Sequence, residues 1–582
     1  MRAVSILVTL AKMTGEGGMP VQQGRWRRGR GVVAAAVVAF VGTVSVGCAQ
    51  GSAAGAQEQL TISIQGGPGS LNPIQASTAS QFDVLNNTME GLVRIGPTGV
   101  PQGGIARSWN VSGDGLTYTF TLRNAKWSNG DAVTAQQFVD AWRQALDPRT
   151  ASAYSSAFSY IQGAQALLQL QLPDQTKDPS GYQTAVAKIP GLLKSLGVQA
   201  TGAHTLVVHL AQPTPYWLEL TALPPYFPVD STFVQKVGAS HYGGSAQDVL
   251  SDGPFQLASW QHGGKLVLTR NPDYWDAGAV RLQQVTLLEV TQPATEVNLW
   301  NTGQIDITTP SLPQGFITRF KGTAGFQSAA EATSVYVVTN THNTALANPL
   351  IRQAFSLAVN RQQLAQDVVR GNALPAYALV PPVIDYTPGQ PFTNLVGKVL
   401  PLSANATQAK RDLAQGLNAL GLKQMPAVTL LTLNNSAQQT QGQALQAMWK
   451  QVLGVQVNLQ PLDPNTFFAD LQQGQFDLGL LGWNADYNDP TTFLNLFLGN
   501  SSMNLTGWNN ATFNQDLQAA QGTVSASARG RDLAAASRLL LSQLPVIPLY
   551  WTSRNWMVRP DVHGFVVYPT GPDYSLKWTY VG

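Results

Sequence analysis

The stretch that decides the fold is residues 427–483, AVTLLTLNNSAQQTQGQALQAMWKQVLGVQVNLQPLDPNTFFADLQQGQFDLGLLGW. Apolar or alternating segments predict strands near residues 428–433, 455–459 and 476–483. Between them, apolar residues at helical spacing predict two helices, the first of which ends at Gly454, a residue suited to a helix C-terminus. These helical positions are Leu445, Met448, Trp449, Val452, Phe467, Phe468 and Leu471. Strands that alternate with helices predict an α/β lobe.

The segment that leaves the last of these strands is where a binding site is expected. In open α/β sheets, ligands lie beyond the carboxyl ends of the strands. The segment is residues 482–490, GWNADYNDP, and Asp486 is its candidate binding residue. From the segment alone, a carboxylate that only stabilises a turn is an equally good interpretation of Asp486.

Length and composition indicate a large globular protein. The chain has 582 residues, of which 44% are hydrophobic and only 12% charged, with a formal net charge of +3. Chains of this length usually divide into two or more domains. No run of Lys or Arg beyond the N-terminus suggests a nucleic-acid partner. Because Cys48 is the single cysteine, we expect no internal disulfide and no Cys-rich metal site.

Residues 1–47 have the features of a secretory signal. A cluster of four arginines precedes an apolar run, residues 32–46, which is short for a membrane span. The arginines are Arg25, Arg27, Arg28 and Arg30. The sequence SVGC at residues 45–48 resembles a bacterial lipobox, although Ser45 stands where such motifs usually carry Leu. The resemblance implies cleavage before Cys48 and a lipid on its thiol.

The same region allows other interpretations. An ordinary signal peptide with an incidental Cys48 is the alternative to a lipoprotein. The signal is unusually long, so Met19 is an alternative start to Met1. Residues 48–59 are mostly small and polar, which predicts a flexible tether.

Two further stretches predict regular elements. Residues 116–123 alternate in character, so their apolar members are expected to face a core. These are Leu116, Tyr118, Phe120 and Leu122, and they follow a turn signal at Asp114-Gly115. Asn348 and Pro349 predict the start of a helix, with Asn as the cap and Pro at the first position.

Several segments resemble the oligopeptide-binding proteins of bacterial ABC importers, which are members of the extracellular solute-binding protein family 5. The most specific match is residues 482–504, which contain Asp486. The others follow in the order of the family: residues 89–93, 106–109, 114–123, 127–130, 146–152, 213–216, 252–255, 271–275, 303–306 and 375–377. The similarity covers nearly all of the chain from about residue 60.

The resemblance implies an α/β fold of the two-lobed periplasmic-binding-protein type (type II). Lobe I would span residues 60–308 with an extra subdomain at about 80–212, and lobe II would span residues 309–548. Residues 549–582 would return to lobe I. The implied function is that of an exported monomer, anchored to the outer face of the cell membrane, which captures oligopeptides and delivers them to permease and ATPase subunits. No cofactor and no metal are implied.

A receptor that is indifferent to peptide sequence should bind the invariant parts of a peptide. The α-ammonium needs an anion, the backbone needs an exposed strand edge, and the side chains need roomy, wet pockets. By resemblance, Asp486 binds the ammonium, and the backbones of Trp483 and Asn484 pair with the peptide. Ordinary core packing is the alternative for Trp483. Tyr154 is a further candidate for contact with the peptide backbone.

Three positions depart from the family. Leu471 and Leu480 stand where short-peptide receptors carry basic residues for the peptide carboxylate, and Gly67 stands where an acidic residue is common. We therefore hypothesise that longer peptides, or a broader range of lengths, are accepted. Low charge would also suit an acidic exterior, in which Asp486 would need a depressed pKa to stay ionised.

Rival functions are weaker. The sequence has no Gly-x-Ser-x-Gly, Walker A or His-Glu-x-x-His motif, so an enzyme is not expected. A calcium loop starting at Asn484 would require Gly at position 489 and Glu at position 495, where Asp489 and Asn495 stand. Within the family, receptors for dipeptides, nickel chelates, haem, opines and sugars remain alternatives.

Overall fold

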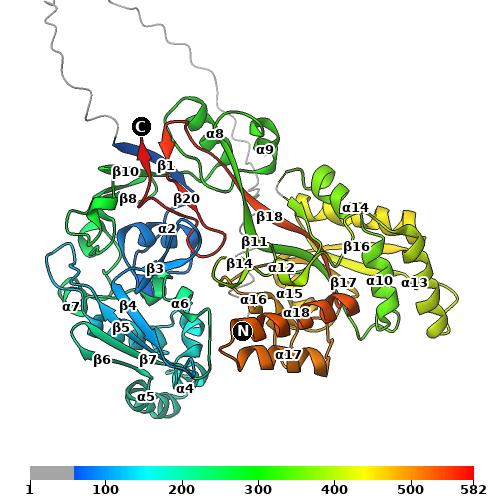
Figure 1. Ribbon diagram of the computed structural model, residues 1–582, viewed down its shortest axis with the longest axis horizontal. Helices are drawn as coiled ribbons and strands as arrows, with labels where there is room; N and C mark the ends of the chain where they lie inside the picture. Colours follow the sequence, from blue (N-terminus) through cyan, green and yellow to red (C-terminus); the bar gives the residue numbers. More distant parts are fainter. Residues whose placement is uncertain (1–57, 372) are drawn as a thin grey trace, which may run out of the picture. The chain divides into compact units, whose positions relative to one another are not determined.

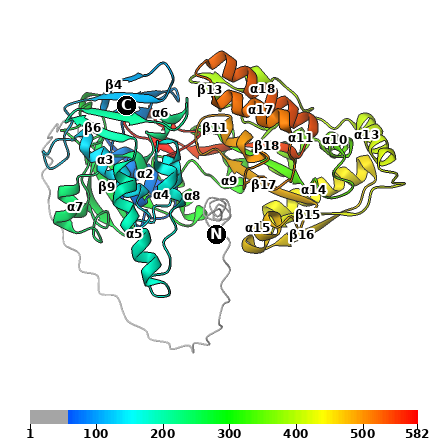
Figure 2. The same cartoon turned by 90° about the horizontal axis from the view of Figure 1, so that it is seen from below.

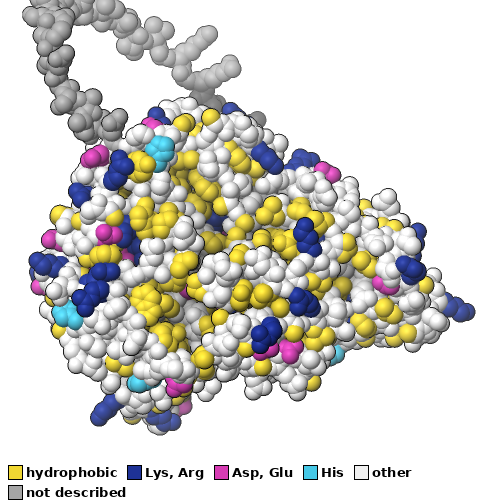
Figure 3. All heavy atoms as spheres, viewed as in Figure 1, with side chains coloured by type: hydrophobic (Ala, Val, Ile, Leu, Met, Phe, Trp, Pro, Cys, Tyr) yellow, Lys and Arg dark blue, Asp and Glu magenta, His cyan; other side chains and the backbone are white. Residues whose placement is uncertain are grey.

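The structure is a computed structural model, and it describes residues 58–371 and 373–582. The arginine cluster, the apolar run and Cys48 of the predicted export signal lie outside the described residues. Charged side chains are sparse on the face shown in Figure 3, as expected from their 12% share of the sequence.

The stretch that predicts an α/β lobe forms three parallel strands and two helices in the expected order. They are β15 (Val428–Leu433), α14 (Ser436–Leu453), β16 (Val457–Leu462), α15 (Pro464–Gln472) and β17 (Leu478–Asn484). β15 lies between β16 and β17 and pairs parallel with both. Gly454 follows α14 with a left-handed φ of 69°. The prediction is confirmed, although β16 spans residues 457–462 rather than 455–459 and β17 begins at Leu478 rather than at residue 476.

Three antiparallel strands, which the sequence pattern did not predict, complete this sheet. They are β12 (Ala373–Pro375), β18 (Val546–Met557) and β11 (Phe326–Thr339), and the sheet has the order β12-β18-β11-β17-β15-β16. β11 pairs antiparallel with β17 on one side and with β18 on the other.

Helices cover both faces of this sheet. α10 (Pro349–Leu357), α13 (Ala406–Ala419) and α14 share one core with alternate residues of β15 and β17. On the other face, Leu471 of α15 lies against Gly479 of β17.

Asn348 caps α10 as predicted, because its side chain accepts from the Leu350 N–H over 2.9 Å. The remaining helices here are α11 (Arg361–Gln363), α12 (Thr393–Val396), α16 (Thr491–Leu494), α17 (Ala511–Gln521) and α18 (Ala526–Gln543), with the hairpin β13 (Asp385–Thr387) and β14 (Gln390–Pro391). A further helix, α9 (Gln314–Phe320), instead packs with Val297 and Met557 in a small separate cluster. α17 and α18 lie side by side (Figure 2).

A second core is built on two four-stranded sheets. The first has the order β1 (Gln59–Ile64), β10 (Gln284–Glu289), β9 (Lys265–Arg270), β8 (Phe255–Gln261). The second has the order β4 (Ala106–Val111), β5 (Thr117–Leu122), β7 (Thr205–His209), β6 (Val198–Gly202). β5 buries Tyr118, Phe120 and Leu122 as predicted. Leu116 precedes the strand and is only half-buried, which corrects that part of the prediction.

Seven helices and a short hairpin accompany these two sheets among the described residues. The helices are α2 (Ala79–Thr88), α3 (Ala135–Leu146), α4 (Ala164–Gln169), α5 (Pro179–Lys194), α6 (Trp217–Leu220), α7 (Ser231–Val237) and α8 (Pro293–Asn301). The hairpin consists of β2 (Val93–Ile95) and β3 (Pro101–Gly103).

β11 and β18 connect the two cores (Figure 1). Ile547 of β18 belongs to the core around β15, whereas Trp556 of the same strand belongs to the core around β1. Ile307 pairs with both Ile62 and Val558, which ties the crossing to β1.

The short strands β19 (Val562–His563), β20 (Val566–Val567), β21 (Tyr574–Ser575) and β22 (Tyr580–Val581) follow. Since Tyr574 packs in the β1 core, the chain end returns to the first lobe, and the fold is the two-lobed α/β fold that the resemblance implied. We refer to the part around β1 as lobe I and the part around β15 as lobe II.

Candidate functional site

One edge of β17 lacks a neighbouring strand over most of its length. β15 pairs with β17 only at Leu478 and Gly479. Residues 480–484 therefore have no strand partner on that side within the described part of the chain. An unpaired edge of this kind can accept an extended peptide as an added strand.

The pairing of β17 with β11 decides which backbone groups face the open edge. The Ala485 N–H donates to the Ala332 carbonyl over 2.8 Å, so these two residues are a hydrogen-bonded pair. Bonded and non-bonded pairs alternate along antiparallel strands. The backbone N–H and C=O of Asn484 consequently point away from β11, toward the open edge. Those of Trp483 point toward β11, so Trp483 is not placed to offer its backbone to a peptide on the open side.

Hydrogen bonds within the loop after β17 fix its conformation. Thr492 Oγ1 accepts from the Asp486 N–H over 3.1 Å and from the buried Trp483 indole over 3.4 Å. Asp489 is buried, and its Oδ1 accepts from the N–H and the hydroxyl of Thr491 over 3.0 and 2.7 Å. The loop is held without any use of the Asp486 carboxylate, for which no ion pair is found among the described residues.

The carboxylate of Asp486 lies where its charge is poorly solvated. Its side chain keeps exposed surface, yet the surrounding protein displaces enough water to raise the pKa of Asp486 to about 6. The depressed pKa that Asp486 would need to stay ionised in an acidic exterior is not found, because burial is the only cause of its shift. A bound ammonium would supply the missing positive charge.

Tyr154 of lobe I faces the same carboxylate. Its ring lies 5.2 Å from the ring of Phe82, between centroids. Burial, and then the charge of Asp486, raises the pKa of Tyr154 to about 12. Burial also raises the pKa of Tyr160, with a smaller contribution from Asp486. The structure thus brings Tyr154 and Asp486 together from opposite lobes.

A tyrosine stack joins the lobes next to this point. The rings of Tyr216 and Tyr487 lie parallel, with centroids 4.2 Å apart and an interplanar angle of 3°. The Tyr216 hydroxyl donates to the Tyr160 hydroxyl over 3.3 Å. Because Tyr487 follows Asp486 directly, this stack holds the loop of lobe II against lobe I.

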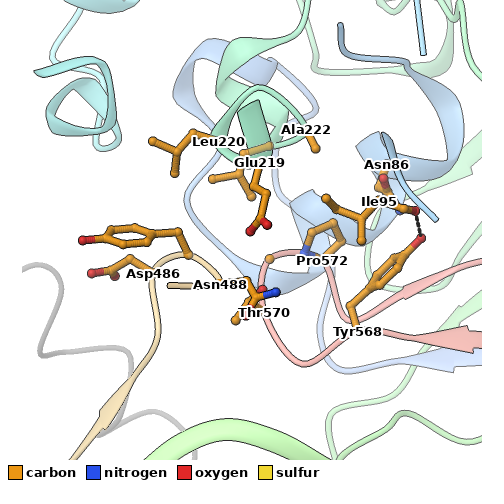
Figure 4. A pocket seen from close by; sticks show the side chains of 13 residues that line it. Asn86, Ile95, Glu219, Leu220, Ala222, Asp486, Asn488, Tyr568, Thr570 and Pro572 are labelled. Carbon is orange, nitrogen blue, oxygen red and sulfur yellow. Dashed lines mark hydrogen bonds between the residues drawn. The ribbon is translucent and has the colours of Figure 1, made fainter. Parts of the chain in front are cut away.

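A small cavity lies between α6 and the Asp486 loop (Figure 4). Its volume is about 30 Å³, and its lining includes Asn86, Glu219, Asp486, Asn488 and Thr570. This is room for about one water molecule, so the cavity by itself is too small to hold a peptide. Glu219 points from α6 toward the loop and accepts a hydrogen bond from the Asn488 N–H. Burial, then the charges of Asp489 and Asp385, raises the pKa of Glu219 well above its ordinary value.

The three departures from the family have structural counterparts. Leu471 and Leu480 are both fully buried in the hydrophobic interior of lobe II, so neither position offers a charge to a peptide carboxylate. A side chain at Gly67 would collide with the carboxylate of Glu289 at the end of β10. Glu289 thus fills the space that the missing side chain leaves, a contact that no pattern in the sequence predicts.

Three residues of this region were not candidates from the sequence: Tyr216, Glu219 and Arg529. Tyr216 ends the family-like segment 213–216, which is the only sequence signal near it. Glu219 lies on the four-residue helix α6, and Arg529 lies on α18. Tyr216 and Glu219 approach Asp486 from the other lobe, and Arg529 approaches from a distant helix of the same lobe, so no local pattern indicates their nearness.

Two searches of the described residues place limits on the site. No group of three or more His, Cys, Asp or Glu side chains is arranged to hold a metal ion within residues 58–371 and 373–582. Over the same residues, no helix combines the length and the apolar character needed to cross a bilayer.

The fold and this interlobe loop define a class of protein. The chain belongs to the bacterial extracellular solute-binding proteins, family 5, because the model of the family's middle region matches residues 100–504. It is 32% identical over 527 residues to the oligopeptide-binding protein OppA of Bacillus subtilis (strain 168), a match that covers 88% of this chain and 91% of the relative.

Two solved structures show the same fold. The periplasmic murein tripeptide binding protein MppA, in its unliganded open form, has a TM-score of 0.76 and 28% identity, over 90% of this chain and 98% of that chain. Listeria monocytogenes OppA bound to peptide has a TM-score of 0.65 and 28% identity, over 90% and 99% of the two chains. The family and fold predicted from the sequence are thereby confirmed, and the structure is more similar to the open form than to this peptide-bound one.

Proposed function

We propose that this protein is the substrate-binding component of an ABC importer, and that it captures oligopeptides in the cleft between its lobes. The observation that carries the proposal is the position of Asp486, an exposed carboxylate with no ion pair among the described residues, beside an open strand edge. A peptide offers an ammonium next to an extended backbone, and these two features match that pair of elements.

The backbone of Asn484 supplies the second part of recognition. Its N–H and C=O face the open edge of β17, where they can pair with a peptide whatever its side chains. Tyr154 approaches from lobe I, so a peptide in the cleft touches both lobes. Ligand contacts with both lobes favour the closed arrangement of a two-lobed protein.

Peptide length is set loosely in this proposal. Because Leu471 and Leu480 are buried and apolar, the peptide carboxylate finds no fixed cation at these positions. We infer that longer peptides, or a broad range of lengths, are accepted. Calorimetry with di- to octapeptides tests this inference, and a sharp optimum at three residues would contradict it.

The setting of the protein in the cell is part of the proposal. Export through the signal of residues 1–47 and lipidation at Cys48 would hold a monomeric receptor at the outer face of the membrane, next to its permease and ATPase. The protein would act by binding and not by turnover, with no cofactor and no metal. A peptide that is bound but not cleaved in an overnight incubation supports this, and cleavage would contradict it.

The decisive experiment compares free-amine peptides with their N-acetylated forms by calorimetry. Asp486→Asn should weaken binding of the free-amine peptide by about 10- to 100-fold, since a charge-assisted hydrogen bond is lost. Acetylation should weaken binding to the unaltered protein by a similar factor. The control is Asp367→Asn, which removes an exposed carboxylate from another part of lobe II. Equal affinity for both peptide forms would refute the proposal.

The main alternative is a different solute within the same family, such as a dipeptide, a nickel chelate, haem, an opine or a sugar. A sugar gives an ammonium-binding carboxylate no role. Native mass spectrometry of the purified protein would identify a ligand that co-purifies with it.

A further inference from the structure

Arg529, in the first turn of α18, reaches the loop that carries Asp486. Its guanidinium is buried, with 2% of the side chain exposed. Nη2 donates to Asp489 Oδ1 over 2.8 Å, and Nη1 donates to the Tyr386 carbonyl over 3.1 Å. Burial alone would lower the pKa of Arg529, but the charge of Asp489, its hydrogen bond and the nearby Tyr216 and Tyr487 together raise the pKa. Arg529 and Asp489 thus form a buried ion pair.

Asp489 connects Arg529 to the segment that carries Asp486. Its Oδ1 accepts three hydrogen bonds, from Arg529 and from the N–H and hydroxyl of Thr491. The next residue, Thr492, accepts from the Asp486 N–H. A short chain of contacts therefore runs from α18 through Asp489 to the backbone of Asp486.

Arg529 also reaches lobe I. Its guanidinium carbon lies 6.0 Å from the ring centroid of Tyr216, at the edge of the usual range for a cation–π contact. Tyr216 stacks on Tyr487, the neighbour of Asp486. Arg529 therefore binds Asp489 of the loop directly and also lies near Tyr216, the lobe I residue that stacks on the same loop.

We infer that Arg529 is a positioning residue for the ammonium site, and that it acts on Asp486 by anchoring Asp489 and balancing its charge. This inference rests on the proposed function. It gives Arg529 two effects. First, it fixes where the Asp486 carboxylate meets the peptide. Second, it neutralises the charge of Asp489, so that Asp486 can ionise without an unbalanced negative charge nearby.

The charged and titratable surroundings make the second effect measurable. The groups that face Asp486, Asp489 and Arg529 are Tyr154, Tyr160, Tyr216 and Glu219 of lobe I, with Tyr487 and Asp385 of lobe II. None of these six groups carries a positive charge, so Arg529 is the cation that balances Asp489. Without it, the buried Asp489 stays unbalanced, and ionisation of Asp486 requires a higher pH.

The test measures two quantities by calorimetry: the ratio of Kd for N-acetylated over free-amine peptide, and the pH at which free-amine binding is half-maximal. Arg529→Met, which keeps the length of the side chain but not its charge, should lower the ratio at least about tenfold and move the midpoint up by about one pH unit. Arg529→Lys should give smaller changes in both. Adding Asp489→Asn to Arg529→Met should return the midpoint to its original value, because the unbalanced charge is gone.

Arg361→Met is the matched control. Arg361 is also buried in lobe II, but it donates to the carbonyls of Ser356, Pro401 and Pro548 and to the Ser356 hydroxyl, away from the loop. It should lower Tm and leave the ratio and the midpoint unchanged. A ratio that stays within about twofold in both Arg529 variants overturns the inference, as does an equal loss in Arg361→Met. If Arg529→Met does not fold, the Lys variant decides alone. An unaltered protein that fails to distinguish the two peptides refutes the proposed function itself.

Discussion

At the scale of the residue, the charge of Asp486 should control when peptides bind. The surrounding protein raises the pKa of Asp486 to about 6, so in the empty protein this carboxylate is ionised above that pH and neutral below it. Only the ionised form attracts an ammonium strongly. Affinity for free-amine peptides should therefore be greatest near pH 7 and fall about tenfold for each pH unit well below 6. It should also decline above about pH 8, because the α-ammonium of the peptide then loses its own proton.

Calorimetry from pH 4.5 to 8 checks this dependence. Asp486→Asn should bind weakly at every pH, with a flat profile, whereas Asp367→Asn should keep the profile of the unaltered protein. A profile that stays flat down to pH 4.5 would show that Asp486 remains ionised or does not bind the ammonium.

The sequence predicted some residues of the site better than others. Asp486 could be found because it follows a strand that the pattern predicted, at the end where ligands bind. Tyr216, Glu219 and Arg529 could not, because each is brought to the loop by packing between distant elements. The raised pKa of Asp486 could not be predicted either, because the burial that causes it arises only in the folded protein.

At the scale of the element, successive residues of β17 point their backbone N–H and C=O groups alternately toward β11 and toward the open edge. The order of strands and helices from β15 to β17 was predictable from hydrophobic spacing. The facing of the backbone was not, because it follows from the register of β11 against β17, which only the structure shows. This register turns the N–H of Asn484 to the open edge and the N–H of Trp483 toward β11.

The alternation leads to a prediction for Asn484→Pro. Proline lacks the N–H but is tolerated on an edge strand whose N–H is unpaired. The variant should fold with nearly unchanged Tm and bind peptides about 3- to 10-fold more weakly, which is the loss of one hydrogen bond. Binding is measured by calorimetry and Tm by thermal unfolding.

Asn484→Ala is the matched control for this change. It removes the side-chain contact between Asn484 Oδ1 and the Thr333 hydroxyl, 2.9 Å long, but keeps the backbone N–H. It should bind peptides within about twofold of the unaltered protein. Equal weakening in both variants would assign the effect to the side chain and contradict strand addition at this edge.

At the scale of the whole molecule, the two lobes depend on long connections that local patterns hide. The α/β character of lobe II was predictable, but β11 and β18 were not, because each passes from one core to the other and so lacks a single alternating pattern. The return of the chain end to lobe I entered the sequence analysis only through resemblance to a family. Hydrophobic spacing predicted the α/β character of lobe II, whereas the connection between the lobes could be identified only from the folded structure.

Buried carboxyl groups of lobe I should make the protein more stable in mild acid. Asp252 is buried beside Glu90, and burial, then the charge of Glu90, raises the pKa of Asp252 well above its ordinary value. The nearby Arg94 is engaged by Glu90 over 3.0 Å, and its charge offsets only part of the rise in the pKa of Asp252. The pKa values of Asp83 and Glu219 are raised as well, in each case chiefly by burial.

The sign of the effect follows from proton binding. These groups hold protons in the folded state at pH values where the unfolded chain, with pKa values near 4, has released them. Stability is therefore highest near pH 4 to 5 and falls as pH rises through the folded-state pKa values. Tm should drop by about a few degrees between pH 5 and pH 8. Asp252→Asn should reduce that drop and raise Tm at pH 8, because the introduced amide cannot ionise while its oxygen can still accept from the Glu90 N–H. Scanning calorimetry across this range measures the slope of Tm against pH, with Asp367→Asn as the exposed control. A Tm that rises from pH 5 to pH 8 would contradict the assignment of these carboxyl groups as protonated in the folded state.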